Sequence, residues 1–155
     1  MDKIDHVSWK QWVFATHDEW TGTILRLTLG SILFPHGAQK LLGWFNGPGF
    51  DGEMQFFTEV MGLPWIIGFS VIVIEFFGAL SLIIGLATRF WAIAIIGLMI
   101  GIILTSHLEY GFFMNWFGNQ AGEGFEYHLL VIGLALAALL QGSGKYAVDG
   151  QIQKQ

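Results

Sequence analysis

The chain has 155 residues, of which 54% are hydrophobic and only 12% charged, about half the charged share of a typical soluble domain. A soluble protein of this length could not cover its surface with so few charges, whereas a protein surrounded by lipid does not need them. The net charge of −5 offers no basic face for nucleic acid, so we expect no nucleic-acid partner. Because there are no cysteines, disulfides, thiol chemistry and cysteine-ligated clusters are excluded within this chain.

Four apolar stretches predict an all-α integral membrane protein. They cover residues 21–42, 64–87, 90–108 and 125–141. A membrane-spanning helix needs roughly 20 residues, within a range of about 17–25, and all four stretches qualify. The second contains a single charge, Glu75, and the third contains none. We therefore expect residues 1–155 to form a single membrane domain, a bundle of four spanning helices.

The segment before the first span predicts an N-terminal interfacial helix over residues 8–18. Ser8 and Gln11 have the spacing of a capping box, in which each side chain caps the other residue's backbone. Trp9, Trp12 and Val13 follow near helical spacing. An amphipathic helix of this kind lies in the membrane surface. A flexible tail is the alternative.

Proline, glycine and serine residues mark helix ends and candidate helix contacts in the rest of the chain. Pro64 can begin the second helix without losing a hydrogen bond, and residues 50–60 can form a short helix within the long connection that precedes it. The pairs Gly97-xxx-Gly101 and Ser81-xxx-Gly85 are of the kind that lets membrane helices approach closely. The other interpretation is that glycine is simply common in membrane helices.

The distribution of basic residues predicts the orientation in the membrane. Four spans place both termini and the turn near residue 89 on one side. The basic residues on that side are Lys3, Lys10, Arg89, Lys145 and Lys154. The opposite side carries only Lys40. Cytoplasmic loops carry an excess of Lys and Arg, so we expect a multi-pass protein with both termini in the cytoplasm.

Apart from a group at the outer ends of the predicted spans, two ionisable residues fall inside them, where charge is costly and commonly functional. Arg26 lies near the cytoplasmic end of the first span and Glu75 near the middle of the second. An Arg26–Glu75 ion pair is one possibility, although their depths differ by some ~8–10 Å at ~1.5 Å per residue. Arg26 reaching to the cytoplasmic interface is the other. Glu75 serves either as a relay or binding group or as part of a structural polar network.

A cluster of ionisable side chains is predicted at the outer end of the bundle. His36 and Lys40 lie four residues apart, on one face of the first helix. His107 ends the third span, and Glu126 and His128 begin the fourth. Imidazole groups bind metals and haem and move protons near neutral pH. The alternative is that interface histidines only hydrogen-bond to loops or lipid head groups.

This cluster suits more than one ligand. A quinone head group needs hydrogen-bond donors for its oxygens and protons on reduction, and it is the ligand we expect first. A metal ion held by His36, His107 and His128, or a haem held by two histidines, is also compatible with these residue types.

Residues 34–49, FPHGAQKLLGWFNGPG, resemble the DoxX family of small bacterial membrane proteins, which typically show a His-Gly-x-Gln-Lys-Leu run leading into a glycine-rich loop. Glu126-Tyr127 at the start of the fourth span and GKYAVD at 144–149 are similar to the family's later motifs. The likeness extends from about Leu25 to Asp149. His128 departs from the family pattern, in which many members have proline or an apolar residue there.

The resemblance implies a four-helix bundle in the bacterial inner membrane and a link to redox metabolism. The related DoxD family belongs to a thiosulfate:quinone oxidoreductase, and some DoxX proteins accompany membrane oxidoreductase complexes. The matched motifs contribute His36, Gln39, Lys40 and Glu126 to the candidate site, and the residue pattern adds Glu75, His107 and His128.

Three functions follow from these observations. The first is a subunit of a quinone-linked redox complex, with a ligand or proton-relay site in the outer leaflet. The second is a non-enzymatic anchor or assembly subunit, and the third is a haem or metal membrane protein. The expected partners are the lipid bilayer and either other membrane or periplasmic redox proteins or further copies of this chain.

Overall fold

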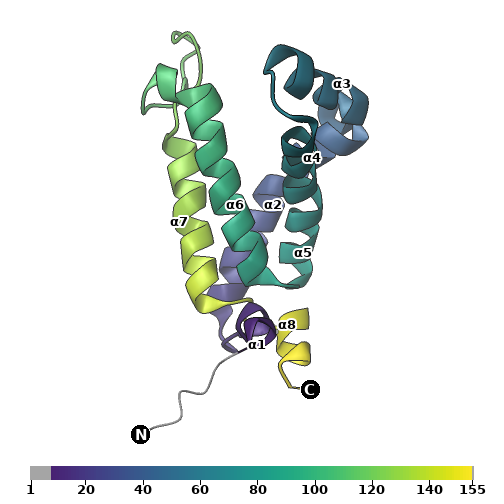
Figure 1. The fold of residues 1–155 in the computed structure, drawn as a ribbon. Helices are drawn as coiled ribbons and strands as arrows, with labels where there is room; N and C mark the ends of the chain where they lie inside the picture. Colours follow the sequence, from purple (N-terminus) through teal and green to yellow (C-terminus); the bar gives the residue numbers. More distant parts are fainter. Residues whose placement is uncertain (1–7, 155) are drawn as a thin grey trace, which may run out of the picture.

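The computed structural model describes residues 8–154, which form helices and loops and no strand. Four long helical segments make up the body of the molecule (Figure 1). They are α2 (Trp20–Leu42); the continuous helix α4 (Trp65–Val73), η3 (Ile74–Gly78) and α5 (Ala79–Ile84); α6 (Thr88–Ile102) with its extension η4 (Ile103–His107); and α7 (Glu126–Gln141). Each lies within a few residues of an expected span. The all-α prediction is confirmed for the described residues.

Short helices lie at both ends of this body. One end, called here the loop end, carries η1 (Trp44–Asn46), α3 (Gly49–Gln55), η2 (Phe56–Val60) and η5 (Leu108–Tyr110). The other, called here the terminal end, carries α1 (Trp9–Phe14) and α8 (Val148–Ile152), which lie together below the long helices (Figure 1). The short helix expected within residues 50–60 is present as α3 and η2.

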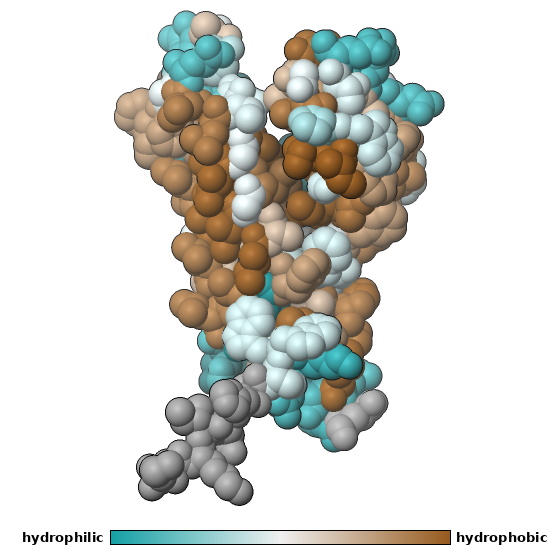
Figure 2. Space-filling model, in the orientation of Figure 1, coloured by the Kyte–Doolittle hydropathy of each residue, from teal (hydrophilic) through white to brown (hydrophobic). Residues whose placement is uncertain are grey.

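The long helices expose apolar side chains on their outward faces. Ile66, Phe90, Leu104, Leu130 and Leu140 are each more than half exposed, and brown, hydrophobic residues cover much of the face shown in Figure 2. Two helices of the described chain, Trp65–Ile84 and Thr88–Tyr110, are long and apolar enough to cross a membrane, and Glu126–Gln141 is a shorter apolar helix. A soluble monomer rarely exposes so large a contiguous apolar surface.

The interior is organised around α2. This helix packs against α5 and η3 on one side and α7 on the other, while α6 packs mainly against α7. The main apolar core gathers leucine, isoleucine and small alanine side chains from all four long segments, including Leu29, Leu82, Ile95, Val131 and Ala135. Toward the loop end the α4 helix diverges from α6 (Figure 1).

Glycine permits close helix contact at positions other than the expected pair. A Cβ on Gly37 of α2 would lie 2.6 Å from the carbonyl oxygen of Glu75, and a Cβ on Gly30 would lie 2.9 Å from that of Ala79. At Gly97 and Gly101 a Cβ would meet nothing within 4 Å. Of the two interpretations of Gly97-xxx-Gly101, close helix contact is not supported, because no described helix packs against that face of α6. In the second pair, a Cβ on Gly85 would lie 2.5 Å from Ala147 Cβ, so this glycine does allow a close approach.

The second and third long helices are interrupted by π-helical turns, η3 and η4, which the sequence pattern did not predict. Glu75 lies in η3 and His107 in η4. A π turn widens the helix locally and changes the direction of its side chains, and such turns are frequent at functional sites.

The N-terminal helix is shorter than expected. The capping box is present, since the Ser8 amide donates to Gln11 Oε1 at 2.9 Å and the Gln11 amide to Ser8 Oγ at 3.2 Å. The helix nevertheless ends at Phe14 instead of continuing to residue 18. It packs against α6 and α8, and the Arg89 guanidinium lies 5.6 Å from the centroid of the Trp12 ring.

The terminal end collects the basic residues that the orientation prediction used. Lys10, Arg89, Lys145 and Lys154 belong to α1, the start of α6 and the segment around α8. Lys3 lies outside the described residues. The side of the membrane that this end faces stays a prediction.

The C-terminal segment folds back beneath the helices and is held by two buried charges. Arg26, 3% exposed, donates to backbone carbonyls at the end of α5 and in residues 143–146, including Ser143 O at 2.8 Å and Lys145 O at 3.1 Å. Neither expectation for Arg26 is correct: it does not pair with Glu75, and its side chain is buried rather than extended to the interface. The resemblance at residues 144–149 thus covers a segment that closes the bundle.

Asp149, 1% exposed, caps the start of α6 from the outside. Its carboxylate oxygens accept from the amides of Ala87 at 2.6 Å and Thr88 at 3.1 Å. Those amides begin a helix and have no partner within it. Burial raises the pKa of Asp149, and the hydrogen bonds from the Thr88 and Ala87 amides, together with the neighbouring Ser143 and Thr88 hydroxyls, act in the opposite direction.

Candidate functional site

A cavity of about 400 Å³ lies at the loop end, between α2, η3, η4 and α7. We call it the polar cavity. The polar residues that line it are His36, Lys40, Glu75, His107, Glu123, Tyr127 and His128. Five of these belong to the predicted site, so the structure brings together residues from three of the four expected spans and Glu75 from the remaining one.

An ion pair between Lys40 and Glu75 forms one wall of the cavity. Lys40 Nζ lies 2.8 Å from Glu75 Oε2, and the side chains are 20% and 5% exposed. The close approach of Gly37 to the Glu75 backbone sets α2 and η3 at the distance that this pair requires. A buried carboxylate without such a partner would be strongly disfavoured.

Buried polar atoms along this cavity lack hydrogen-bond partners within residues 8–154. They are Tyr127 Oη, His128 Nδ1 and Glu75 Oε2, whose contact with Lys40 does not have hydrogen-bond geometry. Most buried polar atoms in proteins are paired, and each exception requires an explanation. Because these atoms line one cavity, they indicate a site where a bound polar molecule supplies the missing hydrogen-bond partners.

The two histidines at the cavity are in mutual contact. His107 Nδ1 lies 2.7 Å from the carbonyl oxygen of Glu123. Since a carbonyl only accepts, Nδ1 carries the proton, and a neutral His107 ring has its acceptor at Nε2. The ring centroids of His107 and His128 are 4.4 Å apart, with the planes inclined at 41°. Rings in direct contact at this distance leave no space for a haem between them.

A metal ion held by His36, His107 and His128 is not supported. Across residues 8–154 no three His, Asp or Glu side chains are arranged to hold a metal ion. His36 lines the rim of the cavity and is exposed, whereas His128 is 7% exposed.

Two predicted residues have local roles outside the cavity. Gln39 donates to the carbonyl of Phe45 at 3.3 Å and so closes the turn after α2. Glu126 accepts from the Met114 amide at 3.2 Å and from Trp116 Nε1 at 3.1 Å, and these bonds hold the connection before α7. Neither residue lines the polar cavity.

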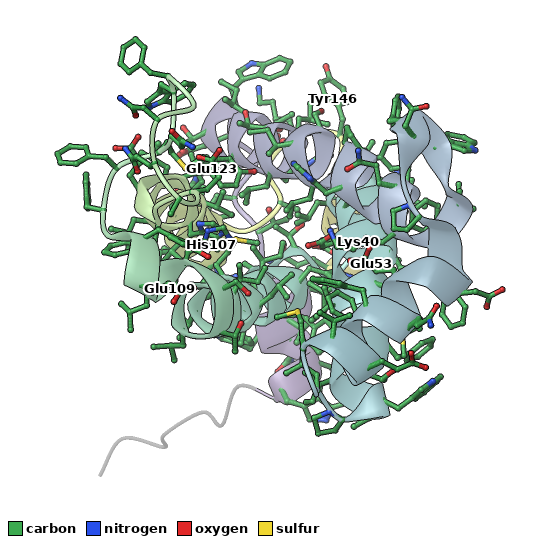
Figure 3. The ribbon with its side chains drawn as sticks, turned by 90° about the horizontal axis from the view of Figure 1, so that it is seen from above. Lys40, Glu53, His107, Glu109, Glu123 and Tyr146 are labelled. Atoms are coloured by element: carbon green, nitrogen blue, oxygen red, sulfur yellow. The ribbon has the colours of Figure 1, made fainter. Side chains whose placement is uncertain are left out.

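The structure adds Tyr127 and Glu53 to the candidate site. Tyr127 takes the inward position expected for its neighbour Glu126. The one sequence signal for Tyr127 was its position between the candidates Glu126 and His128. Glu53, on α3, lies beside Lys40, and both are on the opposite side of the view from His107 (Figure 3). Burial raises the pKa of Glu53, the nearby charge of Lys40 lowers it, and that of Glu75 raises it further.

Comparison with known proteins agrees with the resemblance in residues 34–49. Residues 22–108 match the DoxX family. The chain is 33% identical over 126 residues, 81% of its length and 82% of the relative, to the Bacillus subtilis (strain 168) protein named "Putative oxidoreductase CatD". It is 30% identical over 113 residues, 73% of its length and 82% of the relative, to "Inner membrane protein YqjF" of Escherichia coli (strain K12). No solved structure matches. The chain belongs to the DoxX family of membrane proteins.

Proposed function

We propose that the protein is a subunit of a quinone-linked redox complex in the bacterial inner membrane, and that the polar cavity binds the quinone head group and exchanges protons with it. The observation that carries the proposal is that two buried polar atoms, Tyr127 Oη and His128 Nδ1, have no hydrogen-bond partner in the described chain and lie in one cavity beside the Lys40–Glu75 ion pair. The relatives' names, an oxidoreductase and an inner membrane protein, agree with this assignment.

The donors of the cavity match what a quinone presents. A quinone has two carbonyl oxygens and no hydrogen of its own to donate. Tyr127 Oη and Lys40 Nζ are donors that face one space, and a buried donor gains most from an acceptor that replaces water. The cavity also has a volume within the range of about 300–1,000 Å³ that small-molecule sites occupy.

The protons of the reaction have a route through residues of this chain. Reduction of a quinone to a quinol takes up two electrons and two protons. His128 is in contact with His107, which reaches the loop at Glu123, so the pair connects the buried cavity with the surface. Glu53, whose pKa is raised by burial, can hold a further proton near the Lys40–Glu75 ion pair.

The electrons come from a partner. Within the described residues no side-chain group other than tryptophan and tyrosine could carry an electron, and the chain has no cysteine. We propose a membrane or periplasmic redox protein, bearing a flavin, haem or iron–sulfur cluster, as the donor or acceptor. In this arrangement the four long helices span the membrane, both termini are cytoplasmic and the polar cavity lies in the outer leaflet.

Quinone binding by the Tyr127→Phe variant tests the proposal. The protein is placed in lipid nanodiscs and titrated with a tail-less benzoquinone. Removing one hydrogen bond should weaken binding roughly fivefold, as expected for about 1 kcal/mol. The matched control is Tyr146→Phe, because Tyr146 is 84% exposed at the terminal end. Equal affinity of wild type and Tyr127→Phe, or no binding by the wild type, would contradict the proposal.

A further inference from the structure

A second cavity, of about 340 Å³, opens beside the polar cavity, between η2, α4 and η3 on one side and α6 and η4 on the other. We call it the apolar arm. Figure 2 shows the hollow between these two walls, with brown, hydrophobic residues on both sides and a paler strip along the α6 side. Phe57, Ile67, Val71 and Leu98 contribute to its lining.

The two cavities adjoin each other. Lys40, Glu75, Ile102 and His107 line both of them. The charged and titratable residues of the apolar arm are therefore all at its inner end, where it meets the polar cavity. A ligand that occupied both would need a polar head and a hydrocarbon extension.

The remaining polar side chains of the arm are turned back onto their own helices. Ser70 Oγ donates to the carbonyl of Ile66 at 2.7 Å, and Thr105 Oγ1 donates to that of Gly101 at 2.9 Å. The third, Ser106, has its Oγ 3.2 Å from Thr105 Oγ1. A hydroxyl satisfied by the preceding turn does not require a polar ligand. The arm away from its inner end thus accepts hydrocarbon without leaving a hydrogen bond unmade.

The arm exists because α6 has glycines where other residues would fill it. Gly97 and Gly101 line the arm, and a Cβ on either would meet nothing within 4 Å. The flanking residues Ile66 and Leu104 are 60% and 64% exposed, on faces that we place against lipid. The opening therefore leads sideways into the hydrocarbon of the bilayer.

We propose that the apolar arm holds the hydrocarbon tail of a membrane quinone, which enters sideways between α4 and α6 and places its head group in the polar cavity. This inference rests on the proposed function. Glu75, whose side chain is 5% exposed and whose Oε2 lacks a hydrogen-bond partner, marks the junction at which head and tail meet. The ligand class is thus a tailed quinone of the membrane and not a water-soluble one.

Filling the arm tests the inference. Gly101→Leu and Gly97→Leu each place a large apolar side chain in the arm, and leucine favours a helix more than glycine does. Gly133→Leu is the matched control, because a Cβ on Gly133 of α7 also meets nothing within 4 Å and Gly133 lines neither cavity. Each variant is titrated in nanodiscs with a benzoquinone that carries a long alkyl tail and with the same head group without a tail.

We expect Gly101→Leu and Gly97→Leu to weaken binding of the tailed quinone at least about tenfold, a difference of 1.4 kcal/mol, and to leave the tail-less quinone unaffected. Gly133→Leu should bind both as the wild type does. A photoreactive group at the end of the tail should label α4 or α6 in the wild type and lose this labelling in Gly101→Leu.

Three other outcomes would overturn the inference. If the tailed quinone binds both glycine variants as well as it binds the wild type, the tail lies elsewhere, although the head-group site stands. If the variants lose a co-purifying phospholipid and keep their quinone affinity, the arm holds a lipid chain. If the wild type binds neither quinone, the proposed function fails, and the inference fails with it.

Discussion

The two ends of the bundle bury charged residues in opposite ways. At the terminal end, Arg26 and Asp149 are 3% and 1% exposed, and each is surrounded by backbone groups that it pairs with. At the loop end, Glu75, Tyr127 and His128 are in contact with a cavity, and each retains an atom without a hydrogen-bond partner in the described chain.

Three more buried atoms without a hydrogen-bond partner in the described chain lie at the terminal end, but their surroundings differ from those at the loop end. The hydroxyls of Thr88 and Ser143 lie beside the Asp149 carboxylate and hold down its pKa, so a rotation of each hydroxyl gives it an acceptor. Arg89 Nε is the third, and the same guanidinium donates to the Leu140 carbonyl at 3.2 Å. None of the three lines the polar cavity.

The difference separates structural charges from functional ones. A buried polar group costs free energy unless it is hydrogen-bonded, and a buried charge costs more. The terminal end recovers this cost within the chain, so its charges serve the fold. At the loop end Lys40 balances the charge of Glu75, but Tyr127 Oη and His128 Nδ1 have no partner in the described chain. Buried atoms of this kind are explained where a ligand completes their interactions.

The largest expected effect is that of Arg26→Met. Methionine preserves much of the apolar volume but leaves the carbonyls of residues 143–146 and the end of α5 without a donor. We expect the free energy of unfolding to fall by about 4 kcal/mol, measured by denaturant titration in mild detergent. Arg89→Met, which removes a hydrogen bond to one carbonyl, is the matched control. A similar loss in both variants would show that Arg26 does not hold the C-terminal segment.

Lys40→Met should have the next largest effect, because it leaves Glu75 without its counter-charge. We expect the free energy of unfolding to fall by roughly 3 kcal/mol. This is the lower end of the range for breaking a buried ion pair, because Lys40 is 20% exposed. Combining it with Glu75→Gln removes the uncompensated charge and should restore most of the stability. Quinone binding should remain weak in the double variant. Recovery of both properties would mean that the pair is structural.

Asp149→Asn tests the cap at the start of α6. The amide NH₂ of asparagine would face a backbone N–H, either of Ala87 or of Thr88, where a carboxylate oxygen now accepts. We expect a loss of about 1–2 kcal/mol in the free energy of unfolding and unchanged quinone affinity. The exposed Asp51 provides the control Asp51→Asn. A loss of quinone affinity in Asp149→Asn would contradict the separation of the two ends.

The helices of this fold can be predicted from the sequence because an apolar run as long as residues 64–87 is compatible with few structures other than a long helix. The partner of Glu75 could not be predicted in this way. Arg26 and Lys40 lie on the same helix, and the choice between them depends on how α2 is placed along η3, which Gly37 determines by its contact with the Glu75 backbone. Counting residues estimates how deep each side chain lies in the membrane, but it cannot include that contact.

The inward residue at the start of α7 could not be predicted either. Glu126 and Tyr127 are adjacent, so they point in different directions on a helix. The Glu126 amide donates to the Phe112 carbonyl at 2.9 Å, and this backbone contact helps to fix the rotation of the helix. It directs Glu126 to the loop and leaves Tyr127 at the cavity. The π turn that contains His107 likewise has no periodic pattern by which to recognise it.

The smallest expected effect concerns Glu53, and it is a dependence on pH. Burial raises the pKa of Glu53 above its ordinary value of 4.5, so the folded protein binds this proton more tightly than the unfolded chain does. The proton on Glu53 therefore contributes to stability in full below about pH 4.5. This contribution is lost as the pH rises through the raised pKa of the folded protein. The wild type should therefore lose stability relative to Glu53→Gln as the pH rises from about 4.5 through the raised pKa, as measured by thermal unfolding at a series of pH values.

Glu59→Gln is the control, because Glu59 is exposed and accepts a hydrogen bond from Gln55 at 2.9 Å. Parallel pH profiles for the wild type and Glu53→Gln would show that Glu53 holds no proton beside Lys40, and the proton-exchange part of the proposal would then rest on the His107–His128 side of the cavity alone.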